Sequence, residues 1–239
     1  MPRPLRRLIL PVLLTAMVYG ASLRGRLSMV LALLVAFGVL TLVFVVFPRL
    51  AHGAFERGEF GRAEVYYRLT RFFVANLESR GAIDVSLAGC RLARADWMGA
   101  LQDLGDVEPE ELGPPARAAW YNNRAYALAR GGADPSDALL AIDEAVRLRP
   151  DVAGFRHTRG VVLLALDRVD DAIAELDAVW QAVAGDGAPP LLEAERCYDL
   201  GRAWSKKGEA EYAKDYFKRA ASIAPGSGWG LKAQAALAA

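Results

Sequence analysis

The pattern of hydrophobic and polar positions divides the chain into an apolar head and a long amphipathic body. Residues 27–47 form an apolar run without a charged side chain. A helix rises about 1.5 Å per residue, so this run covers roughly 30 Å, the thickness of the hydrocarbon core of a bilayer. No polar face interrupts the run, which argues against a buried core helix. The pattern therefore predicts a membrane-spanning helix over residues 27–47.

A shorter apolar segment precedes this run. Residues 8–23 also lack charge, but they contain Pro11 and Gly20. Three interpretations are open: a second span over residues 5–23 that forms a hairpin with the first, an interfacial or re-entrant helix, or a cleaved signal peptide. The segment Tyr19–Ala21 is a poor cleavage site and a full span follows at once, so we favour the hairpin. Residues 1–50 are thus predicted to be a membrane anchor, which turns at residues 24–26.

The charge distribution supports an anchor and indicates its orientation. Residues 1–50 carry six arginines and no acidic residue, whereas the whole chain has a formal net charge of +1, so the body is acidic. A nucleic-acid binder would instead gather positive charge on its folded domain. Arg3, Arg6 and Arg7 place the start of the chain on the cytoplasmic side. Two spans would return the body to the cytoplasm at the cell (inner) membrane, which we predict; a single span would leave it periplasmic or extracellular.

After Pro48 the apolar residues follow helical spacing, and one pattern recurs. Its clearest copy, from Tyr198 to Pro225, has small residues at Gly201 and Ala213 and a large one at Phe217. The alanines that match Ala213 in the other copies give positions 63, 100, 138, 172 and 213, at intervals of 37, 38, 34 and 41 residues. The pattern resembles the tetratricopeptide repeat, which implies that paired helices touch at small residues, namely Ala63, Ala100, Ala125, Ala138, Gly160, Ala172, Gly201 and Ala213.

This order of small, large, glycine and proline positions resembles the tetratricopeptide repeat (TPR) family, whose period is 34 residues. The resemblance covers residues 51–225 and implies an all-α superhelix, or solenoid, of about five antiparallel helix pairs behind the transmembrane hairpin. Residues 226–239 resemble the capping helix of such solenoids, with Trp229 and Leu231 packed on the last pair. Two departures are Arg91, at a usually apolar position, and the missing proline after the fourth copy.

The resemblance also implies a concave groove, lined by the first helix of each repeat, that binds a peptide or a partner helix. Asparagine and arginine side chains can hold a peptide backbone and a carboxylate in such a groove. The alternative is that these side chains only bond to neighbouring backbone or form a solvated face. The candidate groove residues are Asn122, Tyr126, Arg130, Arg156, His157, Tyr198 and Arg202.

The sequence recommends no catalytic residue, metal site, cofactor or small-molecule substrate. His52 and His157 lie in different repeats without neighbouring ligands, and the glycines at 131 and 132 belong to the turn of a repeat. Carboxylate pairs such as Glu193 and Glu195 are expected on solvated helix faces. Cys90 and Cys197 are expected to be buried, small apolar residues.

Three functions follow from these features. The first is a membrane-tethered adaptor or scaffold that binds a protein or peptide partner in the groove. The second is a structural or assembly subunit that meets other membrane proteins through its transmembrane helices. The third is a noncatalytic subunit of an enzyme complex, or a divergent enzyme, although no motif favours it.

Overall fold

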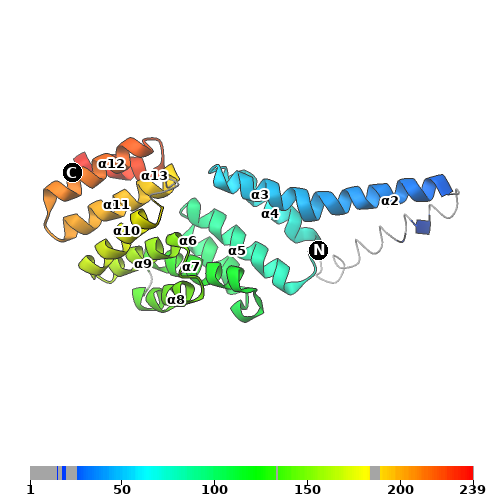
Figure 1. Ribbon diagram of the computed structural model, residues 1–239, viewed down its shortest axis with the longest axis horizontal. Helices are drawn as coiled ribbons and strands as arrows, with labels where there is room; N and C mark the ends of the chain where they lie inside the picture. Colours follow the sequence, from blue (N-terminus) through cyan, green and yellow to red (C-terminus); the bar gives the residue numbers. More distant parts are fainter. Residues whose placement is uncertain (1–14, 16–17, 20–25, 133, 184–188, 239) are drawn as a thin grey trace. The chain divides into compact units, whose positions relative to one another are not determined.

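The computed structural model describes residues 15, 18–19, 26–132, 134–183 and 189–238 (Figure 1). Every regular element within these ranges is a helix. The chain forms two compact units, residues 1–116 (unit 1) and 117–239 (unit 2), which we describe separately. The predicted span over residues 5–23 and its turn fall largely outside the described residues, so the hairpin stays a prediction.

Unit 1 begins with one long helix. Helix α2 (Arg26–Thr41) passes through a π-helical segment, η1 (Leu42–Val46), directly into α3 (Phe47–Glu56) (Figure 1). Within the described residues, Met29–Glu56 is the one helix long and apolar enough to cross a membrane, and only 6% of its most apolar stretch is buried. This low burial is unlike that of a core helix in a soluble domain. The first helix of the first repeat therefore continues the apolar helix without a linker.

Two helix pairs complete the described part of unit 1. Helix α3 pairs with α4 (Phe60–Phe73), and α5 (Leu77–Ala93) pairs with α6 (Trp97–Gly105). The short 3₁₀ helix η2 (Pro109–Glu111) comes after α6. Buried Ala54, Ala63 and Cys90 join α3, α4 and α5 in one apolar cluster. Arg91, the polar residue at a usually apolar position, lies 3.0 Å from Asp96 and 2.7 Å from Asp103. The second repeat thus accommodates Arg91 by ion pairs rather than by apolar packing.

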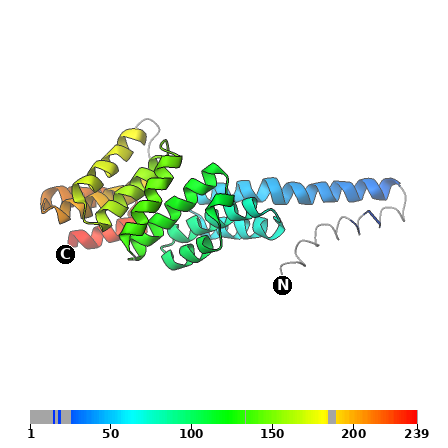
Figure 2. The ribbon, with the colours of Figure 1, turned by 90° about the horizontal axis from the view of Figure 1, so that it is seen from below.

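Unit 2 holds three further helix pairs and a terminal helix (Figure 2). Its helices are α7 (Pro114–Gly131), α8 (Pro135–Leu148), α9 (Ala153–Ala165), α10 (Val169–Val183), α11 (Pro190–Lys206), α12 (Ala210–Ile223) and α13 (Gly228–Ala238). Glycines let the paired helices approach closely, because a Cβ atom on Gly160 would lie 2.7 Å from Leu176 Cγ, and one on Gly201 would lie 2.6 Å from Phe217 Cδ1. All eight small residues expected at helix contacts are buried.

The five turns between paired helices share one backbone feature. Each contains a residue with a positive φ angle, a region that favours glycine because a Cβ atom is strained there. These residues are Gly58 (76°), Ala95 (60°), Gly132 (74°), Asp167 (62°) and Gly208 (86°). A residue with left-handed backbone conformation therefore follows the first helix of each of these five pairs. At two of the five positions this residue is not glycine, so its side chain is strained.

Replacing Ala95 with glycine is expected to raise the free energy of unfolding of unit 1 by about 0.5–1 kcal/mol. The left-handed conformation costs a residue with a Cβ roughly 1–2 kcal/mol, and the greater backbone entropy of glycine offsets part of this gain. Urea unfolding of the full chain measures the change. The matched control is Ala82→Gly inside α5, which should lower stability by about 1 kcal/mol. If both substitutions destabilise equally, the left-handed turn at Ala95 is wrong.

The two cysteines are buried at 0% exposure, Cys90 in unit 1 and Cys197 in unit 2. Burial raises the pKa of each thiol to about 12. A thiol reacts as its thiolate, so we expect neither cysteine of the native protein to react with Ellman's reagent near about pH 8, and both to react in denaturing urea. Fast reaction of either thiol without urea would contradict the burial.

Candidate partner-binding face

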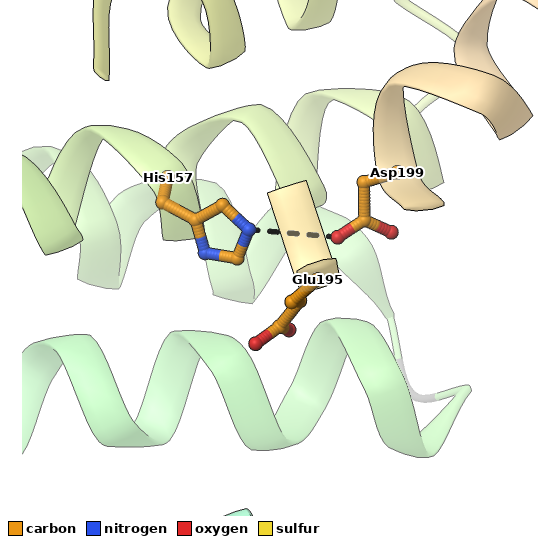
Figure 3. A group of neighbouring side chains, drawn as sticks. All are labelled: His157, Glu195 and Asp199. Carbon is orange, nitrogen blue, oxygen red and sulfur yellow. Dashed lines mark ion pairs between the residues drawn. The ribbon is translucent and has the colours of Figure 1, made fainter. Parts of the chain in front are cut away.

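The first helices of the three pairs in unit 2 bring five polar side chains together. Tyr126 and Arg130 come from α7, His157 from α9, and Glu195 and Asp199 from α11; Figure 3 shows the last three. We name these five residues the Arg130 cluster. The Tyr126 hydroxyl donates a hydrogen bond to Glu195 Oε1. Arg130 Nη1 donates to Asp199 Oδ1 at 2.9 Å, and Arg130 Nη2 donates to Asp199 Oδ2 at 2.5 Å and to Glu195 Oε1 at 2.8 Å.

The Arg130 cluster is almost closed to water. The side chains of Arg130, His157 and Asp199 are 8%, 4% and 0% exposed. Burial alone would raise the pKa of Asp199, but Arg130 and His157 outweigh it and hold that pKa below its ordinary value. Burial likewise opposes the charge of Arg130, yet Asp199 and the other acidic neighbours raise its pKa. Burial and the charge of Glu195 raise the pKa of Tyr126, so Tyr126 stays a protonated donor.

Three members of the cluster could in principle ligate a metal ion. His157, Glu195 and Asp199 each offer a ligand atom, and these atoms lie within 4.8 Å of one another. His157 Nε2 is 3.6 Å from Asp199 Oδ2 and makes no hydrogen bond within the described residues (Figure 3). One imidazole and two carboxylates would suit zinc. However, the Arg130 guanidinium already donates to both carboxylates, and a metal ion would have to displace it. The residues present therefore fit an internal ion-pair network better than a metal centre.

The terminal helix α13 contacts this cluster. The Arg130 guanidinium lies 4.6 Å from the ring centroid of Trp229 and 5.2 Å from that of Tyr126, which is cation–π distance. Trp229 also packs against Tyr198, with ring centroids 5.6 Å apart. The expected contact of Trp229 with the last helix pair is therefore present, whereas the expectation for Leu231 is wrong, because Leu231 is 56% exposed.

The structure divides the seven candidate groove residues by exposure. Tyr126, Arg130 and His157 belong to the buried cluster. Arg156 and Arg202 keep 44% and 42% of their side-chain surface exposed, near Glu175 (3.7 Å) and Asp199 (3.5 Å) respectively. Tyr198 is half-buried against Trp229.

Asn122 is the seventh candidate and lies partly buried on α7. Its Nδ2 donates to Asn123 Oδ1 at 3.2 Å, and its Oδ1 is buried without a hydrogen-bond partner in the described residues. Because this oxygen is buried, a partner does not reach it, and such acceptors usually bond to ordered water. Arg156, Tyr198 and Arg202 are thus the candidates that a partner could reach.

Sequence reasoning missed the acidic half of the cluster. The expectation that Glu193 and Glu195 lie on a solvated face is wrong, because Glu195 is 13% exposed and Glu193 is buried. Glu193 accepts two hydrogen bonds of 2.7 Å from the guanidinium of Arg196, which is itself 2% exposed. The available signal was the spacing: Glu195 and Asp199 are four residues apart on one first helix, as are Tyr126 and Arg130 on another.

Comparison with known proteins identifies the fold. No model of a known protein family matches the chain, and no curated protein does. A thermophilic TPR protein of Thermus thermophilus superimposes with a TM-score of 0.55 at 21% sequence identity, over 80% of this chain and 95% of that one. YrrB, a TPR protein with an unusual peptide-binding site, gives 0.42 at 18% identity over 80% and 91%. PilF of Pseudomonas aeruginosa gives 0.43 at 15% over 80% and 96%. The body of the chain thus has a TPR-like helical-repeat fold.

Proposed function

We propose that this protein is a membrane-tethered adaptor. It binds a peptide or helix of another protein on the face of unit 2 that the first helices α7, α9 and α11 form. The observation that carries this proposal is the convergence of α7, α9 and α11 on one polar face, with accessible Arg202 beside a buried ion-pair network and Arg156 exposed on α9. Exposed Arg156 and Arg202 can pair with carboxylates of a partner.

The buried part of the face has a different role from the accessible part. Arg130 donates two hydrogen bonds to Asp199 and so links α7 to α11. Such a network fixes the spacing of the first helices, so the accessible side chains are presented in a set geometry. In this proposal the Arg130 cluster positions the binding face, and Arg156, Tyr198 and Arg202 contact the partner.

The long apolar helix supplies the tether. Exposed apolar side chains such as Leu34, Val35 and Phe37 surround α2, which suits lipid and not water. Holding the body at a membrane raises its effective concentration near partners there, so weak peptide binding can suffice. With two spans the body is cytoplasmic; with one it is periplasmic or extracellular. A reporter fused at the carboxyl terminus shows on which side of the membrane the body lies and so distinguishes one span from two.

Site-directed photocrosslinking of the full chain in its native membrane tests the adaptor proposal. A photoreactive residue at Arg156 or at Arg202 should capture the same partner. The matched control is Leu140 on α8, which is 73% exposed but belongs to a second helix. A partner captured equally from Leu140, or no common product from Arg156 and Arg202, would refute the assigned face.

A second candidate function is an assembly subunit that acts through its membrane helix. Ala32 and Ala36 lie one turn apart on α2 and would allow close approach of another helix, as would Gly38 and, in the segment before, Gly20 and Ala21. Exchange of residues 1–47 for an unrelated membrane span discriminates between the adaptor and the assembly subunit. The adaptor should tolerate the exchange, whereas the assembly subunit should lose function.

A further inference from the structure

The end of α4 carries an exposed apolar patch. Leu69, Phe72 and Leu77 are 40%, 37% and 59% exposed, and Phe73 and Val74 are half-buried beside them. We name residues 69–77 the α4 tip. A cluster of exposed apolar side chains on one small segment usually marks a contact surface.

The continuity of the long helix sets the position of this tip. Helix α4 runs antiparallel to α3: Phe55 and Phe60 pack across the turn, and Phe47 packs on Tyr66 with ring centroids 6.0 Å apart. Because α4 continues beyond Tyr66 to Phe73, its last turns pass the start of α3 and lie against η1. Val43 of η1 is accordingly buried to 3% exposure, although its apolar neighbours Leu42 and Phe44 are exposed.

The level of the tip relative to the apolar run follows from this packing. The run ends at Phe47, and η1 forms its last turn. Residues near Val43 are about 6 Å inside the end of the run, at 1.5 Å per residue. If residues 27–47 span a bilayer, the α4 tip lies at the depth where headgroups meet acyl chains.

Ion pairing holds the tip in place. Arg71 pairs through two nitrogens with Asp84 of α5, which is 8% exposed, and Thr70 is 4% exposed. The Asn76 side chain accepts a hydrogen bond from the Ser79 amide and so caps α5. The apolar side chains of the tip are therefore displayed by a fixed corner rather than by a loose loop.

We propose that the α4 tip inserts into the lipid–water interface beside the membrane helix and gives unit 1 a second membrane contact. This inference rests on the membrane tether of the proposed function. The occupant is a lipid surface because α4 lies against η1, the last turn of the apolar run that the proposal places in the membrane. Exposed Arg68 directly precedes the tip on α4 and can extend towards phosphate groups while its methylene stem stays in the interface. The tip fixes the tilt of unit 1 on the membrane.

Spin-label accessibility in vesicles tests this insertion. The full chain is reconstituted in phosphatidylcholine with a minority of phosphatidylglycerol, and single labels are attached at Phe72→Cys, Leu69→Cys, Val65→Cys and Val35→Cys. The two native thiols are buried and stay unlabelled. Val65 is the matched control, because it is 55% exposed on the same helix but lies about 10 Å from Phe72 along the helix axis, on the side away from the apolar run. Val35 reports the tether alone.

The inference predicts greater collision with oxygen than with a water-soluble nickel chelate at Phe72→Cys, at Leu69→Cys and at Val35→Cys, and the reverse at Val65→Cys. Water-like accessibility at Phe72→Cys and Leu69→Cys, with lipid-like accessibility at Val35→Cys, would refute insertion of the α4 tip and leave the proposed membrane tether intact. Water-like accessibility at Val35→Cys would refute both the membrane tether and the insertion of the tip. Labels at the tip shielded from both reagents would mean that protein covers it, which also refutes lipid insertion. Helical circular dichroism equal to that of the parent shows that each variant is folded.

Discussion

Substitution of Asp199 with alanine is expected to lower the free energy of unfolding of unit 2 by about 3–5 kcal/mol. Asp199 is 0% exposed, and it accepts two hydrogen bonds from Arg130, which is itself 8% exposed. Removing one partner of a buried ion pair leaves the other charge in a poorly solvated site, and this residual charge accounts for most of the loss. Glu195 retains one contact with Arg130 and cannot replace the bidentate pair.

Urea unfolding followed by tryptophan fluorescence measures this loss, because four of the five tryptophans lie in unit 2. The control is Asp151→Ala, which removes an exposed pair with Arg149 and should leave the unfolding midpoint unchanged. If the Asp199 and Asp151 variants unfold at the same urea concentration, the Arg130 cluster does not stabilise unit 2.

The same substitution has a defined pH dependence. The pKa of Asp199 is lower in the folded protein than its ordinary value of about 3.9. Its stabilising contribution is therefore complete above about pH 4 and declines as the pH falls towards the folded pKa. The stability difference between the parent and Asp199→Ala should be smaller at about pH 3 than at about pH 7.

The repeat architecture was accessible from sequence because it depends on local sterics. Gly160 and Gly201 lie where a Cβ atom would meet Leu176 and Phe217, so residue size alone indicates the contact. Such constraints act within one helix pair and recur at a regular interval, which makes them visible in a single sequence. The length and polarity of residues 27–47 are likewise local properties.

Only half of the chemistry of the candidate face could be predicted from the sequence, because that chemistry depends on contacts between repeats. Arginine and tyrosine on α7 were recognised, but the carboxylates they bind come from residues 69 positions later on α11. Helical spacing shows which residues share a face and does not show how deeply that face is buried. Helix α13 adds a further cover, because Trp229 lies over Arg130.

Replacing Phe217 with alanine is expected to lower the free energy of unfolding of unit 2 by about 3–5 kcal/mol, the range typical of buried phenylalanine. Phe217 is 8% exposed, fills the space that Gly201 leaves, and packs on Tyr198 with ring centroids 5.8 Å apart. Its removal opens a cavity between α11 and α12 that a glycine cannot fill. Leu140→Ala, at a side chain 73% exposed, is the control and should change stability by less than about 0.5 kcal/mol.

The double variant with Gly201→Ala decides whether the two positions act as one packing unit. In the parent, a methyl at residue 201 would lie 2.6 Å from the Phe217 ring and should destabilise by about 1–3 kcal/mol. In the Phe217→Ala background the same methyl enters the cavity, so its effect should vanish or become stabilising. Calorimetric melting of both single variants and the double variant gives the coupling. Strict additivity would mean that Gly201 and Phe217 do not share a contact, and the small-to-large packing of the fifth repeat would have to be abandoned.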